Sequence, residues 1–366
     1  MSGEVRIALD AMGGDGAPKT PVAGAAAAIA DSTEDFHVLL VGDPAAIETE
    51  LAGFDSRDRL EILPASQTIG PNERPVFAVR RKRDSSIVVG LRAVESGEAD
   101  AFISAGSTGA VMAASVFILG ALPGVYRPPV AALFPTMRGP TLVLDVGANI
   151  SPRPHHLHQF AHLGSIYIRD LLGIENPRVG LLNVGEEMGK GGDLAVATYR
   201  LLEADTALNF VGNVEGHEII EGACDVLVCE GFAGNVLVKF YESMAGTVLE
   251  FLDEKFAQAR AELEQVFRFL DYTEFGGAPL LGVNGVTIIC HGASQPRAIA
   301  NAIGTAVMSS RSGIVADMAR DLEGLPRWWR RPWPPTRPRR PCGQGRRARC
   351  RASSCRRSPR GRDRRR

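Results

Sequence analysis

The sequence contains no apolar run long enough to cross a bilayer, and no secretory signal is recognisable at its start. The longest apolar stretches, such as residues 110–122, fall short of the about 20 residues that a membrane-spanning helix needs. Residues 1–10 carry acidic side chains and continue directly into a strand-like segment. We therefore expect a cytoplasmic protein whose membrane contacts are peripheral.

Cysteine is scarce, and its placement does not resemble a disulfide framework. The chain has six cysteines, three of which (Cys342, Cys350 and Cys355) lie in an Arg-rich C-terminal segment. The other three, Cys224, Cys229 and Cys290, lie in apolar, strand-like runs. Such a pattern predicts reduced, buried thiols in the body of the protein.

Most of the chain has fewer basic than acidic residues. The tail of residues 325–366 holds 17 of the 41 basic residues and one of the 42 acidic residues, so its charge is near +16 and that of residues 1–324 is near -17. Binding to a nucleic-acid backbone needs clustered Lys and Arg. The acidic body argues against nucleic acid as the main partner.

Glycine is abundant by contrast, with 40 residues, and it recurs where a predicted strand passes into a predicted helix. Residues 99–103 alternate as a strand would, and the Ala-rich residues 110–119 predict a helix. The turn between them contains Ser104, Gly106, Ser107, Thr108 and Gly109. Its free backbone N–H groups and the positive end of the helix dipole favour an anion, above all phosphate. The alternative is an ordinary turn capped by Ser107 or Thr108.

This strand, glycine loop and helix unit repeats along the chain and predicts an α/β protein with a parallel sheet. Strands are expected at residues 4–10, 38–41, 60–63, 130–134, 141–144, 178–182, 209–211 and 225–229, with a β-rich segment at 280–290. Helices are expected at residues 18–30, 155–172, 193–202 and 236–270 (the last broken near its middle), and the final clear helix at 296–309. The polar loops after these strands would converge on one ligand-binding edge.

The loop at residues 183–192 holds Asn183, Gly185, Lys190 and Gly191. It is not a P-loop, because three residues rather than four separate its glycines and Gly191 follows the lysine in place of Ser or Thr. A lysine among glycines at a helix start meets an anion or remains solvated. Asparagines at three other strand ends, Asn149, Asn213 and Asn235, can donate hydrogen bonds to the same ligand.

Two groups of side chains have competing interpretations. His155, His158 and His162 have helical spacing that suits a metal, but no cysteine or nearby aspartate supports one, so we expect surface histidines and no metal. His291, at a strand end beside Gly292, suits proton transfer or a structural hydrogen bond.

A cationic run follows residue 79. It consists of Arg80, Arg81, Lys82 and Arg83 and precedes a predicted helix. In an acidic body this run is either a solvated face or the contact for an anionic partner.

Seven motifs in order resemble the bacterial PlsX phosphate acyltransferase family. They are residues 10–15 (DAMGGD), 82–86 (KRDSS), 104–110 (SAGSTGA), 145–149 (DVGAN), 183–187 (NVGEE) with Lys190 and Gly191, 212–216 (GNVEG) and 231–235 (GFAGN). The resemblance runs from about residue 4 to residue 312. His155, His158 and His162 depart from the family pattern.

The resemblance implies a Rossmann-like three-layer α/β/α sandwich of the isocitrate/isopropylmalate dehydrogenase-like type, spanning residues 1–324. It implies a homodimer without metal, nucleotide or other cofactor, a helical hairpin at about residues 245–272 that touches the membrane peripherally, and transfer of product to a membrane-bound glycerol-3-phosphate acyltransferase. The tail at 325–366 lies beyond the family's usual end. It is either the product of out-of-frame translation or a basic, disordered tail for anionic lipid or nucleic acid.

The implied reaction is attack of inorganic phosphate on the thioester of a fatty acyl-acyl carrier protein, giving acyl phosphate for phospholipid synthesis. The loops at 104–109 and 183–191 would hold phosphate, with Lys190 and Asn183 acting on the reacting groups. His291 would protonate the departing thiolate, and the cationic run would receive the acidic carrier protein. The alternatives are acyl transfer from coenzyme A, as in phosphate acetyl- and butyryltransferases, and a non-enzymatic anionic-surface or nucleic-acid binder acting through the tail.

Overall fold

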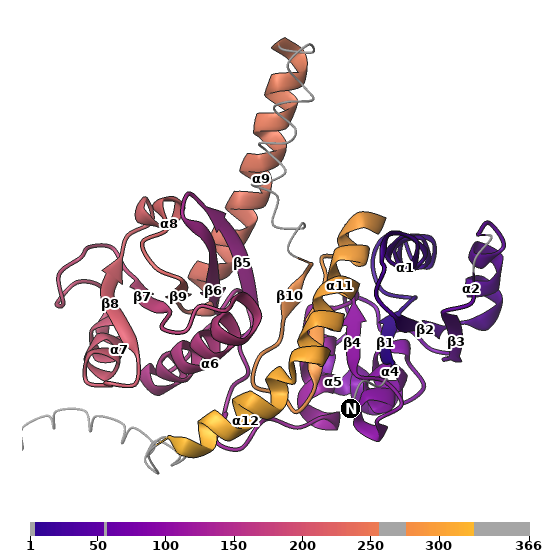
Figure 1. The fold of residues 1–366 in the computed structure, drawn as a ribbon, viewed down its shortest axis with the longest axis horizontal. Helices are drawn as coiled ribbons and strands as arrows, with labels where there is room; N and C mark the ends of the chain where they lie inside the picture. Colours follow the sequence, from indigo (N-terminus) through magenta and orange to yellow (C-terminus); the bar gives the residue numbers. More distant parts are fainter. Residues whose placement is uncertain (1–3, 55–56, 256–275, 326–366) are drawn as a thin grey trace, which may run out of the picture. The chain divides into compact units, whose positions relative to one another are not determined.

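The computed structural model describes residues 4–54, 57–255 and 276–325, which belong to one compact unit. Their strands form two sheets. The first has six strands in the spatial order β10-β11-β4-β1-β2-β3 (Figure 1). The strands are β1 (Val5–Asp10), β2 (Phe36–Gly42), β3 (Leu60–Pro64), β4 (Ala101–Ser104), β10 (Ala278–Pro279) and β11 (Val286–Ile289). All neighbours are parallel except β10 and β11. The carboxyl ends of β1, β4 and β11 therefore lie side by side at one edge.

The second sheet has five strands in the order β5-β6-β9-β7-β8. They are β5 (Ala131–Thr136), β6 (Gly139–Leu144), β7 (Arg178–Leu182), β8 (Asn209–Val214) and β9 (Val226–Val228). Only β5 runs antiparallel to its neighbour, β6. The loops that leave β6, β9, β7 and β8 share one edge of this sheet.

Helices connect these strands and cover the sheets. They are α1 (Lys19–Asp31), α2 (Pro44–Leu51), α3 (Pro75–Arg81), α4 (Ser86–Ser96), α5 (Thr108–Ile118), α6 (Pro154–Leu172), α7 (Asp193–Glu203), α8 (Glu218–Glu221), α9 (Gly231–Lys255), α11 (Pro296–Ser312) and α12 (Ile314–Gly324). Local sequence sets the ends of several helices. Helices α6 and α11 start with proline, whose fixed φ suits the first turn, and stop at Gly173 and Gly313 with φ of 69° and 71°.

Alternating side chains of the six-stranded sheet enter two different layers of core. Ile7 and Leu9 of β1 pack in one cluster with residues of α1 and α11, whereas Ala8 packs in another with residues of α4 and α5. Figure 1 shows α1 and α11 next to each other beside this sheet. A strand whose successive side chains are all apolar is typical of a parallel sheet covered on both faces.

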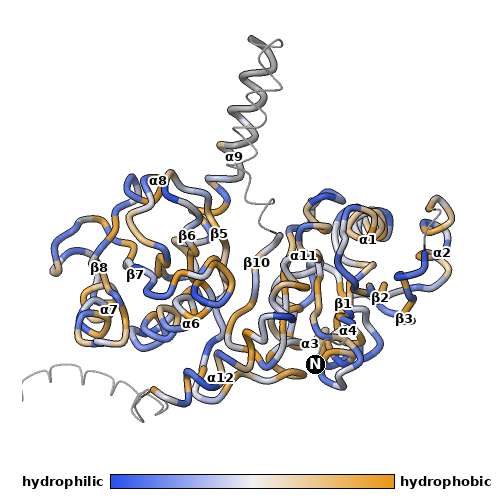
Figure 2. The backbone as a smooth tube through the Cα atoms, viewed as in Figure 1, coloured by the Kyte–Doolittle hydropathy of each residue, from blue (hydrophilic) through white to orange (hydrophobic). Residues whose placement is uncertain are grey.

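The core of the second sheet is continuous with that of the first. Leu142 and Leu144 of β6 pack in the same cluster as β1 and α6, while Val143 packs in a third cluster with Val238 and Tyr241 of α9. Figure 2 shows hydrophobic segments along the strands of both sheets. The loops at the strand ends are therefore mounted on a single packed body.

The α/β class is confirmed, with the strands divided between two mostly parallel sheets. The strand expected at residues 178–182 is β7 with those bounds. The expectation that the last helix lies at 296–309 is wrong, because α11 continues to Ser312 and α12 follows immediately after Gly313. Residues 256–272 of the expected hairpin, and the tail from residue 326, lie outside the described residues. None of the helices that the structure describes is long and apolar enough to cross a membrane.

Candidate functional site

A buried hydrogen-bond chain joins the loops that leave β1 and β4. The Ser104 hydroxyl donates to Asp10 Oδ2 at 2.7 Å and accepts the Gly106 backbone N–H at 3.0 Å. The other carboxylate oxygen, Oδ1, accepts the Met12 N–H at 3.0 Å. Asp10 is only 1% exposed, and this burial raises the pKa of its carboxyl group, although hydrogen bonds from Ser86 and Ser104 act in the opposite direction. One carboxyl group thus fixes two loops.

Glycine permits the close approach of these loops. A Cβ on Gly13 would lie 2.6 Å from Asp10 Oδ2 and 2.7 Å from the Gly106 nitrogen, which is closer than carbon contacts allow. The next residues bring in a third loop, because the Asp15 N–H donates to the Gly292 carbonyl at 2.7 Å. The loops after β1, β4 and β11 are therefore held in direct contact.

A second buried carboxyl group shapes the loop that leaves β6 in the other sheet. Asp145 Oδ1 accepts N–H groups from Val130 at 3.1 Å and Ala148 at 3.0 Å, and Oδ2 accepts that of Asn149. Asp145 is fully buried, which raises the pKa of its carboxyl group against the lowering effect of these bonds. The Asn149 carbonyl then accepts the Gly231 N–H at 2.9 Å, so this loop also fixes the start of α9.

Loops from both sheets line one cavity of about 410 Å³, which we call the interloop cavity. The apolar lining consists of Val130, Ala132, Val146, Val238, Ile289 and Ala298. The polar lining consists of Thr108, Asn235, Lys239, His291 and Ser294. An apolar wall that meets a few polar groups is the usual character of a small-molecule site.

The amino-terminal end of α5 opens into this cavity through Thr108. Ser107 is the N-cap residue, but its side chain makes no capping hydrogen bond. Since helix N-termini attract anions through their N–H groups and dipole, this end of the cavity favours negative charge.

His291 presents a hydrogen-bond donor at the cavity. Its Nδ1 accepts the Ala293 backbone N–H at 3.2 Å, which assigns the proton of the neutral ring to Nε2. Cys290 also lines the cavity, but burial raises the pKa of its thiol to about 12, so it stays protonated near neutral pH. The hydrogen-bond donor here is therefore the imidazole Nε2–H.

Lys239 is a functional candidate that the sequence interpretation missed. It lies one helical turn after Asn235 on α9, and both side chains line the cavity. The sequence contained one sign of it: Lys239 lies four residues after Asn235, so both side chains would lie on the same face of a helix. Lys239 supplies the cavity with a cation.

Several of the expected site residues do not line this cavity, among them Asn183, Gly185, Lys190, Gly191 and Asn213. The first four belong to the loop at residues 183–192, which we call the glycine loop, and Asn213 of β8 contacts it. Asn183 Nδ2 donates to the Lys190 carbonyl at 3.1 Å, and Asn213 Nδ2 donates to the Glu187 carbonyl at 3.0 Å. Lys190 Nζ lies 3.7 Å from Glu187 Oε2 and is half exposed. Both asparagine amides thus bind the backbone of the glycine loop, Asn183 from within the loop and Asn213 from β8.

Asn149 is used in the same way. Its side chain is buried and Nδ2 donates to the Pro128 carbonyl at 3.2 Å. Of the expected site residues with polar side chains, the structure brings Thr108, Asn235 and His291 together at the interloop cavity, while Ser104 holds Asp10 behind it.

The four side chains of the cationic run, residues 80–83, differ in their contacts. Lys82 Nζ donates to Glu73 Oε1 at 2.6 Å, and this bond is the main cause of the lowered pKa of Glu73. The Arg80 guanidinium lies over the Phe117 ring at 5.1 Å. Arg81 and Arg83 are exposed.

The expectation of surface histidines on α6 is wrong. His158 and His162 are 1% and 6% exposed, and His155 is partly buried. The absence of a nearby aspartate is also corrected, because Asp205 lies within hydrogen-bond distance of two of these rings. Spacing along α6 revealed the histidines, whereas the carboxylate comes from more than 40 residues later in the chain. The expectation for Cys224, Cys229 and Cys290 is confirmed, since all three are free and buried.

Comparisons with known proteins place the chain among relatives. Residues 5–316 match a family described as "Fatty acid synthesis protein". Proteins named phosphate acyltransferase are similar over 87% of this chain and 98% of their own length: one from Desulforamulus reducens is 46% identical, and one from Heliobacterium modesticaldum is 47% identical.

Solved structures show a similar fold at low identity. A EutD phosphotransacetylase from Staphylococcus aureus has a TM-score of 0.55 and 16% identity, covering 84% of this chain and 94% of that one. A phosphotransacetylase from Streptococcus pyogenes has a TM-score of 0.54 and 15% identity, covering 88% and 95%.

The contact between Gly13 and the Asp10 carboxylate gives a first prediction. We expect Gly13→Ala to lower the free energy of unfolding by about 1–3 kcal/mol, because the added methyl group overpacks Asp10 and the Gly106 backbone. Urea unfolding of the full chain measures this change. Gly216→Ala is the control, since a Cβ there meets no atom within 4 Å. Equal stability of the two variants would contradict the close approach of these loops.

Proposed function

The chain belongs to the fatty acid synthesis protein family, and we propose that it transfers a fatty acyl group to inorganic phosphate at the interloop cavity. The observation that carries the proposal is the joining of an apolar wall to a helix N-terminus, a lysine and a histidine in one cavity of about 410 Å³. An acyl chain suits the apolar wall and a phosphate dianion suits the cationic end.

The reaction follows from these groups. A phosphate oxygen attacks the thioester carbonyl carbon, and the charge that develops on the carbonyl oxygen is stabilised by N–H donors of the α5 terminus or by Asn235. The carbon–sulfur bond then breaks, giving acyl phosphate and a thiolate. The proton that hydrogen phosphate loses on forming the new bond passes through His291 to the departing sulfur, and Lys239 offsets the charge of phosphate.

The glycine loop is the second place where phosphate could bind, with Lys190 and Asn183 as the groups that act on it. Its support is the concentration of glycine backbone before α7 and the exposed lysine. The interloop cavity is favoured because it also holds apolar surface and a proton donor, which the glycine loop lacks among its described contacts.

The proposed donor is an acyl-acyl carrier protein, and the product serves phospholipid synthesis through a membrane-bound glycerol-3-phosphate acyltransferase. Arg81 and Arg83, with Arg80, would receive the acidic carrier protein, whereas Lys82 is already paired with Glu73. No metal or other cofactor takes part in this reaction scheme.

A homodimer in peripheral contact with the membrane is part of the same proposal. Phe232, Val236, Phe240 and Met244 recur every four residues on α9 and are 48–63% exposed. Such a stripe is suited to a second copy or to a lipid surface. We also place the fold with the isocitrate/isopropylmalate dehydrogenase-like type, on the basis of the family resemblance, and take residues 1–324 as the catalytic domain.

The direct test is to mix the protein with acyl-acyl carrier protein and phosphate and to trap acyl phosphate with hydroxylamine. We expect His291→Gln to lower kcat by about 10²–10⁴-fold, because glutamine keeps a polar group but cannot protonate the leaving sulfur. His217→Gln, at an exposed site, is the control. Absence of a phosphate-dependent product with the wild-type protein would overturn the proposal. A parallel assay with acyl-coenzyme A in place of acyl-acyl carrier protein shows which of the two donors the protein uses.

The two candidate lysines can be separated in the same assay. We expect Lys239→Met to raise the KM for phosphate by about tenfold or more, since a charge-assisted hydrogen bond contributes on the order of 2 kcal/mol. Lys190→Met is the matched comparison and is expected to have the smaller effect. The opposite ranking would move the phosphate site to the glycine loop.

Carrier docking has its own prediction. We expect Arg81→Glu with Arg83→Glu to raise the KM for acyl-carrier protein by about tenfold at low salt and by less at high salt, while kcat changes little. Arg92→Glu, exposed on α4, is the control. A KM equal to that of the control would show that the carrier protein docks elsewhere.

A further inference from the structure

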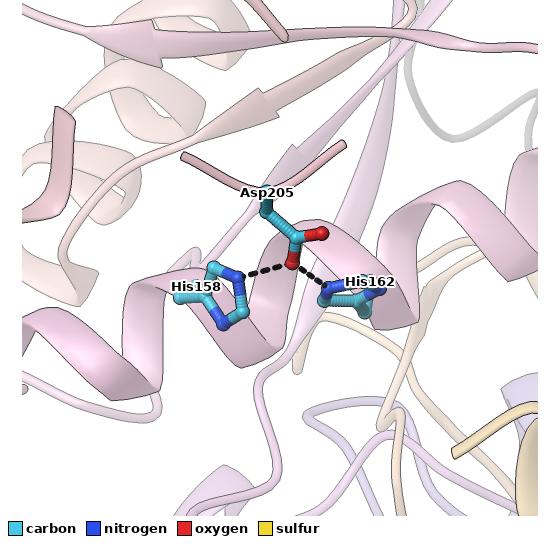
Figure 3. A group of neighbouring side chains, drawn as sticks. All are labelled: His158, His162 and Asp205. Atoms are coloured by element: carbon cyan, nitrogen blue, oxygen red, sulfur yellow. Dashed lines mark hydrogen bonds and ion pairs between the residues drawn. The ribbon is translucent and has the colours of Figure 1, made fainter. Parts of the chain in front are cut away.

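Three side chains of the types that bind metal ions meet beside α6, and none of them lines the interloop cavity. His158 and His162 lie one turn apart on this helix, and Asp205 lies in the turn between α7 and β8 (Figure 3). The Nε2 atoms of the two rings are 2.7 and 2.8 Å from the same atom, Asp205 Oδ2. We call these three residues the histidine–aspartate cluster.

The cluster is held in place before any ligand arrives. His158 and His162 are almost fully buried within the 19-residue α6, which fixes their backbone. The second carboxylate oxygen of Asp205, Oδ1, accepts the Ala207 backbone N–H at 3.0 Å and so orients the carboxylate. Outer hydrogen bonds that orient the ligands are a general feature of metal sites.

Charge favours a cation at this place. A single carboxylate lies between two imidazoles whose neutral form carries no charge, and its side chain is only 15% exposed. Arg169, which lines the adjacent cavity with His162, is paired with Asp170 and Asp321, each at 2.7 Å. A partly buried carboxylate without a full counter-charge is costly, and a bound cation offsets that cost.

The geometry needs only a small adjustment to accept a metal ion. The three ligand atoms lie within 4.8 Å of one another. Tetrahedral coordination at about 2.0–2.1 Å separates neighbouring ligands by roughly 3.3 Å. The Asp205 oxygen would withdraw by about half an ångström, and the proton on each Nε2 would transfer to Nδ1 of the same ring.

A cavity of about 170 Å³ beside His162 offers room for water as a further ligand. We propose that His158, His162 and Asp205 bind one divalent transition-metal ion, with Zn²⁺ as the preferred ion. Two imidazoles and one carboxylate suit Zn²⁺ and its transition-metal neighbours rather than Mg²⁺, which prefers oxygen ligands. None of the three lines the interloop cavity, so the ion acts as a cross-link between α6 and the turn after α7.

The test uses the full chain after treatment with a chelator. Titration with Zn²⁺ by calorimetry is expected to show one ion per chain and Tm is expected to rise by several degrees, because the ion binds the folded state alone. Co²⁺ is expected to give the visible absorption of a tetrahedral site, and Mg²⁺ to give neither signal. These three readouts are independent of acyltransferase activity.

Variants locate the site. His162→Gln and Asp205→Asn are each expected to weaken Zn²⁺ binding at least tenfold, and circular dichroism of each variant checks that it is folded. His37→Gln is the matched control, because His37 belongs to a second group of possible ligands, with Glu4 and Asp35, in which both carboxylates are exposed. Wild-type protein that binds no stoichiometric Zn²⁺, or that binds it as tightly in the Asp205→Asn variant as in the His37→Gln control, would overturn the proposal.

Discussion

The burial of a carboxyl group at the end of a strand is the constraint on which the interloop cavity depends. Asp10 ends β1 in one sheet, and Asp145 follows β6 in the other. Each would be costly to bury alone, and each is instead surrounded by backbone N–H or hydroxyl donors from its own or a neighbouring loop. The loops cannot move without leaving these acceptors unsatisfied. Groups that must meet at a reaction centre, such as Thr108 and His291, are positioned by carboxylates that lie behind them.

Division of the strands between two sheets explains how the cavity acquires two kinds of surface. The six-stranded sheet contributes the α5 terminus and His291, both suited to polar groups, and the five-stranded sheet contributes Val146 and the first turns of α9. A carboxyl-end loop of a parallel strand is polar by necessity, whereas the flank of a strand such as β5 is apolar. An acyl phosphate has the same division between an ionic head and an apolar chain. The two kinds of surface in the cavity thus come from two different sheets, each of which contributes residues to its lining.

The local sequence pattern predicted most helices and strands, but it did not predict which loops come together at the interloop cavity. Strand β7 follows from an apolar run, and the helix expected at residues 155–172 is α6, which begins one residue earlier, at Pro154. Helix α12 was missed because it begins directly at the glycine that ends α11. Lys190 stands among glycines in sequence, yet its loop is built from Asn183 and Asn213 and does not reach the interloop cavity. Lys239 belongs to no recognisable sequence motif. A lysine on a helix is common, and only the tertiary structure shows that Lys239 lines the same cavity as His291. Likewise, Asp205 joins His158 only through packing of α7 against α6, and no local signal encodes that contact.

Helix α7 connects the glycine loop to the histidine–aspartate cluster. The amino-terminal side of the helix follows the glycine loop, whose shape is set by asparagine amides bound to its own backbone. Its carboxyl-terminal side leads into Asp205 and so into the buried face of α6. A metal ion in the histidine–aspartate cluster would therefore stabilise the β7–α7–β8 unit without altering the interloop cavity, which rests on different carboxylates.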